Sequence, residues 1–309
     1  MSHPATARVG ESPPRHARGG DVQDLSLEKL ARPRAALPDL LPAVPVAGAG
    51  SLRSLRAPAR QARLDPCLLI PIYQHGSTIR GVIRSLAEFR LPCIIVNDGS
   101  NAATRAELDA IEEEFHWVEV EHHAENRGKG VALRCGYRLA ASRGFTHVVQ
   151  LDADAQHEAA DVARFLEAAR KFPDAVVLGR PLFDQSAPRS RVYGRRLSQG
   201  MVWLATLSRR VRDPLCGFRC IPLAPTLELM DRIAMGDHME YEPELAVRLV
   251  WEGVPVVNVD TRVRYYADGI SHFDVLWDDL RMAWLYTRLM LGMLLRARRL
   301  LARRIEQVR

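Results

Sequence analysis

From residue 67 onward the chain alternates short apolar runs with longer stretches of helical spacing. The apolar runs, which we predict to be strands, lie at 67–73 (CLLIPIY), 93–97, 117–121, 147–151 and 175–178. Between them, apolar residues recur every three or four positions at 78–89, 102–115, 131–142 and 159–171, and this spacing predicts helices. Short strands that alternate with helices of about 10–15 residues form βαβ units, so we expect an α/β fold with a mostly parallel sheet flanked by helices.

The two ends of the chain follow other patterns. Residues 1–62 are rich in Pro, Ala, Arg and Gly, and four prolines between positions 31 and 50 exclude a continuous helix there. We expect this segment to be a disordered N-terminal arm. Residues 275–309 predict a C-terminal helix, which leaves residues 63–274 as the central domain.

The distribution of charge and the spacing of the cysteines limit the classes of protein to which this sequence can belong. The chain carries a net charge of +6, but the excess of basic residues lies in 1–62 and 275–309, and the central domain is slightly acidic. A basic excess confined to two ends does not indicate a nucleic-acid-binding fold, so we expect no nucleic-acid partner. The five cysteines have neither the spacing of a zinc site nor that of a disulfide framework, which favours a reducing compartment.

Three polar clusters lie at the ends of predicted strands. Asp98 follows the second strand, the stretch 126–130 (NRGKG) lies between a strand and a helix, and the stretch 152–157 (DADAQH) follows the fourth strand. In sheets built from βαβ units, ligands bind outside the carboxyl ends of the strands. These clusters are therefore the first candidates for a functional site.

Each cluster permits a functional and a purely structural interpretation. Asp152 and Asp154 can offer oxygens to Mg²⁺ or Mn²⁺, with Gln156 adding a neutral oxygen, or they can form a turn that caps the next helix. Lys129 and the N–H groups around it can bind a phosphate, or the stretch can be an ordinary helix start. Asp98 can be a plain turn residue. The occurrence of all three clusters at strand ends favours the functional interpretation.

In order along the chain, these motifs resemble those of family 2 glycosyltransferases. The resemblance is carried by 71–73 (PIY), 96–100 (VNDGS), 126–130, 152–157 and 216–219 (CGFR), and it covers about residues 67–270. The spacing is most similar to that of the polyprenyl-phosphate (dolichol-phosphate) sugar transferases. The resemblance implies a GT-A fold with residues 63–274 as the catalytic domain. It also implies a nucleoside-diphosphate sugar donor, a divalent metal (Mg²⁺ or Mn²⁺) and inversion at the anomeric carbon.

The resemblance also implies roles for single residues. The residues expected to bind the nucleotide sugar are Pro71, Tyr73, Asp98, Lys129, Gly130 and Asp152. Asp154 and Gln156 would ligate the metal that bridges the diphosphate. On the acceptor side, Arg180 and Arg195 would hold a phosphate, and Arg219 would help to close the site.

The chemistry of the acceptor is open at this point. The later Arg-x-x-Gly-x-Ser-Lys signature of that branch appears here as 266–272 (YADGISH), so Tyr266 and His272 replace two positive charges. A hydroxyl or carboxyl acceptor on another lipid is therefore an alternative to a polyprenyl phosphate. A phosphate is already a nucleophile, whereas a hydroxyl needs a carboxylate base. The candidates for that base are Asp213, our first choice, and Glu240, Glu242 and Glu244; the last two can instead complement a helix dipole.

The C-terminal helix suggests contact with a membrane. Its apolar run, 282–295, contains Arg288 and is shorter than the roughly 20 residues needed to span a bilayer. Trp277, Trp284 and several leucines are followed by five arginines: Arg296, Arg298, Arg299, Arg303 and Arg304. This composition favours a basic amphipathic helix at the cytoplasmic membrane interface, and the alternatives are a helix packed on the domain or a dimer helix. We therefore expect a cytoplasmic protein that is peripheral to the inner face of a membrane.

Taken together, these features predict an inverting, metal-dependent glycosyltransferase that acts on a lipid-linked acceptor. One alternative is a sugar nucleotidyltransferase, but 71–76 lacks the basic, Gly-rich loop expected after the first strand of such an enzyme. The other alternative is a non-catalytic, membrane-associated protein that binds nucleotide sugars. The acidic pair and Lys129 argue against it.

Overall fold

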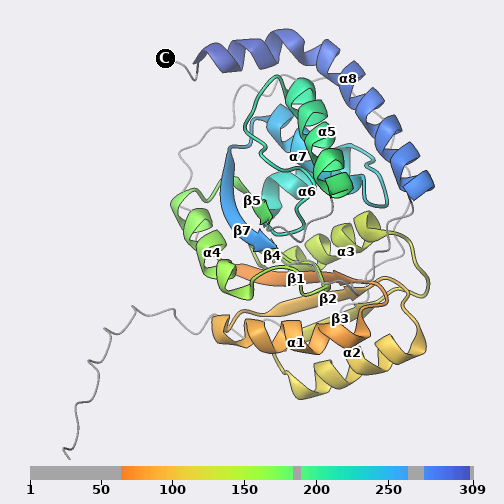
Figure 1. The fold of residues 1–309 in the computed structure, drawn as a ribbon. Coiled ribbons are helices and arrows are strands. Elements are labelled where there is room, and N and C mark those ends of the chain that lie inside the picture. The colour runs from red at the N-terminus through yellow and green to blue at the C-terminus, as the bar shows by residue number, and fades with distance from the viewer. Residues whose placement is uncertain (1–63, 184–188, 264–274, 307–309) are drawn as a thin grey trace, which may run out of the picture.

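The computed structural model describes residues 64–183, 189–263 and 275–306 (Figure 1). The predicted N-terminal arm and the stretch 266–272 lie outside these ranges, as does the side chain of Arg304.

The described chain forms a seven-stranded sheet with the order β3-β2-β1-β4-β6-β5-β7. Its strands are β1 (Pro66–Ile72), β2 (Cys93–Asn97), β3 (Val118–His122), β4 (His147–Gln150), β5 (Val176–Phe183), β6 (Arg219–Pro222) and β7 (Val256–Val263). β6 runs antiparallel to both β4 and β5, and every other pairing is parallel. The expected mostly parallel sheet is confirmed, and the carboxyl ends of β1, β2 and β4 lie at one edge.

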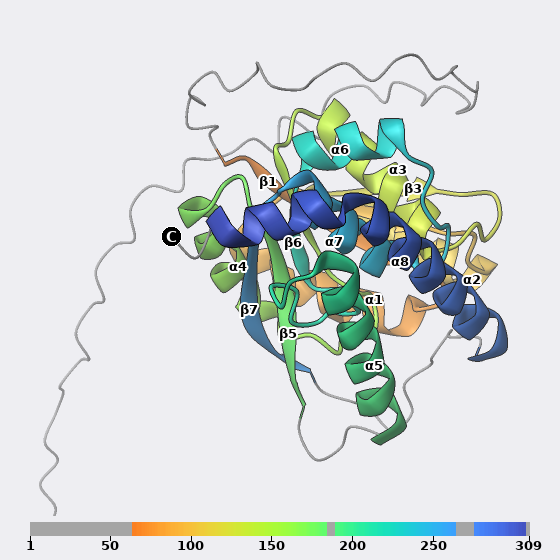
Figure 2. The same cartoon turned by 90° about the horizontal axis from the view of Figure 1, so that it is seen from above.

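Helices and their cores lie on both faces of this sheet (Figures 1 and 2). One core includes α1 (Gly76–Leu86), α2 (Ala102–Glu114) and α4 (Val162–Lys171), with short 3₁₀ turns at Ala87–Phe89 and Ala159–Asp161. The other includes α3 (Lys129–Ser142), α5 (Arg189–Thr206), α6 (Leu223–Arg232), α7 (Tyr241–Glu252) and α8 (Val275–Glu306). Because successive side chains of a strand point to opposite faces, Leu68 and Ile70 of β1 enter the first core and Leu69 enters the second.

The C-terminal helix α8 belongs to the second core. Leu285 and Leu289 are buried there, and Gly292 packs so closely that an added Cβ would lie 2.6 Å from the Trp251 ring of α7. Arg303 donates a hydrogen bond of 2.7 Å to the carbonyl oxygen of Trp251. The predicted C-terminal helix is therefore present over Val275–Glu306 and packs on the domain. Within the described residues, no helix is both long enough and apolar enough to cross a bilayer.

Candidate active site

The three polar clusters lie together at the carboxyl ends of neighbouring strands, as the sequence predicts. Asp98 follows β2, Lys129 begins α3, and Asp152 follows β4. The Nζ atom of Lys129 lies 2.7 Å from Oδ1 of Asp152, which joins the second cluster directly to the third. Asp98 joins the first cluster to the second, because its carboxylate accepts the backbone N–H groups of Arg127 (3.0 Å) and Gly128 (2.8 Å).

Asp98 shapes the loop that precedes α3. It is buried, and its Oδ1 also lies 2.9 Å from Nδ1 of His123. Burial acts to raise the pKa of Asp98, but the hydrogen bonds from His123, Arg127 and Gly128 outweigh it and lower the pKa. These contacts give Asp98 a positioning role. Its predicted contact with a donor stays a prediction.

Gly128 lets this loop pack closely against the segment before α7. Its φ of +100° is in the region that favours glycine, and a Cβ there would collide with the backbone of Asp237 and lie 2.5 Å from the ring of His238. A Cβ on Gly130 would likewise lie 2.7 Å from the carbonyl oxygen of Gly236. The glycines that the sequence places beside Lys129 are therefore required by packing, whatever ligand the loop binds.

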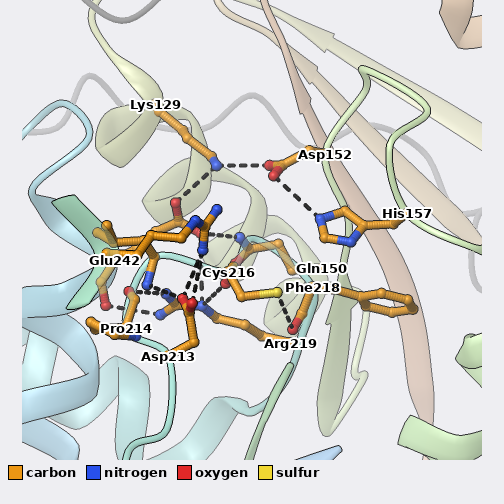
Figure 3. Close-up of polar contacts among 12 residues, drawn as sticks. Lys129, Gln150, Asp152, His157, Asp213, Pro214, Cys216, Phe218, Arg219 and Glu242 are labelled. Carbon is orange, nitrogen blue, oxygen red and sulfur yellow. Dashed lines mark hydrogen bonds and ion pairs between the residues drawn. The ribbon is translucent and has the colours of Figure 1, made fainter. Parts of the chain in front are cut away.

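Lys129 lies between two carboxylates that come from different elements (Figure 3). Its ammonium is 2.7 Å from Asp152 and 2.8 Å from Oε2 of Glu242, in the first turn of α7. Burial acts to lower the pKa of Lys129, but the charges of Asp152 and Glu242 prevail and raise it. Lys129 is therefore a cation throughout the neutral range.

Beneath this ion pair lies a layer of buried polar side chains. Gln150 of β4 donates to Oε1 of Glu242 (2.7 Å), and Tyr137 of α3 donates to Gln150 (2.6 Å). Arg219 of β6, only 1% exposed, donates to the carbonyl oxygens of Cys216, Pro214 and Glu242 at 2.7–2.8 Å. Its guanidinium positions backbone and does not reach the open end of the site. If Arg219 helps to close the acceptor side, as predicted, it would do so by fixing the backbone of Pro214, Cys216 and Glu242, and not by touching the acceptor.

The two acidic residues after β4 have opposite electrostatic environments. Burial acts to raise the pKa of Asp152, but Lys129 and His157 outweigh it and hold that pKa well below its usual range. The pKa of Asp154 is raised by burial and by the negative charge of Asp152. Ionising both groups together is unfavourable unless a further positive charge is present.

This pair fits a hard divalent cation. Asp152 and Asp154 offer carboxylate oxygens and Gln156 an amide oxygen, which are the ligands that Mg²⁺ and Mn²⁺ prefer. One oxygen of Asp154 already accepts the backbone N–H of Gln156 at 3.0 Å, which folds this turn. Within the described ranges, no group of three or more His, Cys, Asp and Glu side chains forms a metal cage. A cation here would share its coordination with Gln156 and with a bound ligand.

Pro71 and Tyr73 lie next to these clusters. Pro71 is a buried residue of β1 opposite Val96 of β2, and Tyr73 is the half-buried residue that follows the strand. The next residue, Gln74, donates its backbone N–H to Oγ of Ser100 (2.9 Å), which ties the end of β1 to the turn after β2. The position suits a nucleoside pocket, and that role stays a prediction.

The predicted acceptor-side arginines are in two different places. Arg195 of α5 donates to both oxygens of Asp213, at 2.8 and 2.9 Å. Arg180 of β5 forms a two-point ion pair with Asp260 of β7, at 2.5 Å for each contact. Arg180 lines a groove of about 450 Å³ between α4 and β7, which includes none of the Lys129 cluster. The structure thus places Arg195 beside the base candidate Asp213 but does not bring Arg180 to the same cluster.

Sequence reasoning missed the contact between Glu242 and Lys129. We considered Glu242 as a base or as a charge at the start of a helix, and the structure instead places its carboxylate on the lysine. Gln150 and Tyr137 were also not identified. The sequence gives only weak signals for them, a polar residue inside an apolar strand and a tyrosine on the buried side of a helix.

Comparisons with known proteins agree with this geometry. The sequence model of glycosyl transferase family 2 matches residues 67–232. An uncharacterised protein of Methanocaldococcus jannaschii is 26% identical over 66% of this chain and 90% of its own length. An undecaprenyl-phosphate mannosyltransferase of Micrococcus luteus is 29% identical over 45% of this chain and 57% of its own length.

A solved structure shows the same fold. It is glucosyl-3-phosphoglycerate synthase from Mycobacterium tuberculosis, in complex with Mn²⁺ and UDP-glucose, and it covers 76% of this chain and 80% of its own with a TM-score of 0.54. The sequence identity is 18%, so this likeness concerns the fold alone. The expected GT-A fold is confirmed.

Proposed function

The chain belongs to glycosyl transferase family 2, and we propose that it moves a sugar from a nucleoside-diphosphate sugar to a lipid-linked acceptor. The proposed reaction needs a divalent cation at Asp154 and Gln156 and inverts the anomeric carbon. The observation that carries the proposal is the Lys129–Asp152 contact, which gathers a lysine, two acids and a helix N-terminus at one edge of the sheet.

The donor would lie across the carboxyl ends of β1 and β4. The N-terminus of α3, which begins at Lys129, points its partial positive charge at this edge of the sheet, and such a position favours a diphosphate. A cation bound by Asp154 and Gln156 would offset the charge of the departing nucleoside diphosphate. Asp152 stays ionised because Lys129 and His157 stabilise its charge, so it contributes a fixed negative charge beside the proposed cation. The Mn²⁺ in the mycobacterial synthase supports the choice of metal class.

The acceptor would approach from the side of α5. On this side of the site, Arg195 forms an ion pair with the buried carboxylate of Asp213. An incoming phosphate can take over Arg195 and needs no base. A hydroxyl acceptor requires a carboxylate oxygen, and both oxygens of Asp213 already accept hydrogen bonds from Arg195. This arrangement favours a phosphate acceptor, the class named for the Micrococcus relative.

Exposed apolar side chains on α5 and α8 support a lipid acceptor and a position at the membrane. Large apolar side chains of α5 and α8 are open to solvent: Tyr193, Leu197, Leu204, Trp277, Leu280, Trp284, Leu291, Leu294 and Leu295. The two helices pack against each other, and α8 also carries the exposed Arg298 and Arg299. Apolar side chains flanked by arginines suit the interface of an anionic leaflet, which would place the protein on the cytoplasmic face of its membrane.

Metal-dependent nucleotide binding tests the donor half of this proposal. Thermal unfolding of the full chain is measured with UDP or GDP, with and without Mn²⁺. We expect the midpoint to rise only when nucleotide and Mn²⁺ are both present, and we expect Asp154→Ala to lose that rise. The matched control is Asp174→Ala, which removes an exposed carboxylate outside the site and should respond like the wild type. A full response from Asp154→Ala would contradict the metal assignment.

A further inference from the structure

Glu242 does not behave as a residue whose only function is to begin a helix. It is buried, and each of its carboxylate oxygens has a partner: Oε2 lies 2.8 Å from Lys129, and Oε1 accepts Gln150 at 2.7 Å. Arg219 donates to the backbone oxygen of Glu242 at 2.8 Å, and Nε of Arg219 lies 3.7 Å from Oε1, so the carboxylate also faces a second cation. Because the side chain is buried and both oxygens already face protein partners, an acceptor has little access to this carboxylate, which argues against Glu242 as the general base.

The partners of Glu242 are themselves fixed. Gln150 is fully buried, and its amide is oriented by the hydroxyl of Tyr137, which is fully buried as well. Arg219 is held by three backbone carbonyl oxygens. The carboxylate of Glu242 is thus held in one place by β4, β6 and α3, and it presents one oxygen to Lys129 (Figure 3).

Glu242 competes with Asp152 for the positive charge of Lys129. One ammonium faces two carboxylates at nearly equal distances, 2.7 and 2.8 Å. If Glu242 were neutral, Lys129 would interact with Asp152 alone and would neutralise it more completely. The net charge around the expected cation would then be more positive by one, and the attraction of this site for a cation would be weaker.

We propose that Glu242 is a positioning residue that shares Lys129 with Asp152, and so keeps Asp152 negative enough to support a cation–nucleotide complex. This role rests on the proposed function, because it assumes that a nucleoside diphosphate and a divalent cation bind beside Asp152. It assigns to Glu242 no contact with the substrate.

The role predicts opposite changes in two affinities. Glu242→Gln keeps the shape of the side chain and an oxygen for Gln150, but it removes one negative charge. We expect the affinity for UDP or GDP with Mn²⁺ to fall by about tenfold, because coupling between neighbouring charged groups is commonly of this size. Without a divalent cation, the affinity for the same nucleotide should stay equal or rise, because the site has become more positive.

Titration calorimetry of the full chain measures both affinities. The matched control is Glu252→Gln, at the other end of α7, which makes the same charge change where the carboxylate pairs with Arg232. We expect it to alter neither affinity. If Glu242→Gln does not fold by circular dichroism, Glu242→Asp withdraws the carboxylate from Lys129 and should shift the affinity with Mn²⁺ in the same direction by a smaller factor.

The outcomes separate this inference from the function on which it rests. If the wild type binds no nucleotide with any divalent cation, the proposed function fails, and this role with it. If the wild type binds but Glu242→Gln lowers both affinities alike, or changes neither, the function stands and the positioning role is overturned.

Discussion

Lys129, one of only three lysines in the chain, links the donor-side clusters to one another. The sequence places it between two glycines before a helix, which suggests a phosphate ligand. The structure adds that its ammonium is held by Asp152 and Glu242. Lys129 and Asp152 are half-buried, so removing the lysine should cost less than the roughly 3–5 kcal/mol that is typical of breaking a fully buried ion pair. Lys129 therefore supports folding as well as the proposed binding of phosphate.

Lys129→Met should reverse the pH dependence that Asp152 gives to stability. In the wild type the folded pKa of Asp152 is depressed, so its contribution is present above the unfolded pKa of about 3.9 and is lost as the pH falls through the folded value. Without Lys129 we expect burial to raise that pKa. The variant should then be destabilised at pH 7 and should gain stability as the pH falls from 7 toward 5.

Urea unfolding of both proteins at several pH values, without divalent cations, measures this effect. His157→Gln serves as a comparison, because it removes the weaker partner of Asp152, 3.7 Å away, and keeps the lysine. A variant Lys129→Met with wild-type stability at pH 7 would show that the ion pair contributes nothing to folding.

At the scale of elements, α8 has two apolar sides with different roles. Trp284 is 64% exposed, whereas its neighbour Leu285 is fully buried against the domain. Leu285→Ala should lower the free energy of unfolding by about 2–5 kcal/mol, the usual range for a buried leucine. Trp284→Ser should change it by no more than about 0.5 kcal/mol, as surface substitutions do. Only the second variant bears on membrane binding.

Co-sedimentation with anionic vesicles tests the exposed side. We expect Trp284→Ser to bind such vesicles less than the wild type does, and we expect wild-type binding to weaken as salt is added, because salt screens the arginines. Folded wild-type protein that ignores anionic vesicles at low salt would exclude the interface role and leave α8 as a packing helix.

The elements also show what the sequence can and cannot predict. Periodicity located β1 to β4 and α1 to α4 to within a few residues, because each is a local pattern of apolar positions, but it ended β5 at Leu178 although the strand continues to Phe183. It gave no topology for β6, a four-residue strand that enters the sheet antiparallel between β4 and β5. For α8, an apolar stripe does not reveal whether its partner is a domain or a lipid: the structure shows that one side packs on the domain, and the membrane role of the exposed side stays a prediction.

The same limit applies to the site. Asp98, the Lys129 loop and Asp152 were found because strand ends gather at one edge of a parallel sheet. Glu242 lies 113 positions after Lys129, and no local pattern joins them; the contact exists because the first turn of α7 packs against α3. The sequence alone does not distinguish the surroundings of Arg180 from those of Arg195. In the structure, Arg180 pairs with Asp260 and Arg195 pairs with Asp213.

At the scale of the whole molecule, the site, α5 and α8 form one arrangement. α7 connects them, because its first turn carries Glu242 toward Lys129 and Glu244 toward Arg288 of α8, 3.3 Å away. A lipid bound along α5 and α8 would therefore lie against two helices that both contact α7, the helix that carries Glu242. We propose that across this arrangement the sugar of a water-soluble nucleotide sugar passes to a lipid, with release of the nucleoside diphosphate.

Transfer of label between phases is the most direct test of that claim. The full chain is incubated with vesicles that contain polyprenyl phosphate, with Mn²⁺, and with UDP- or GDP-sugars labelled in the sugar. We predict that label moves into the organic extract with the wild type and with Asp174→Ala, and that Asp154→Ala loses this transfer. Label that stays in the water phase with every donor, or that moves equally with Asp154→Ala, would contradict the account.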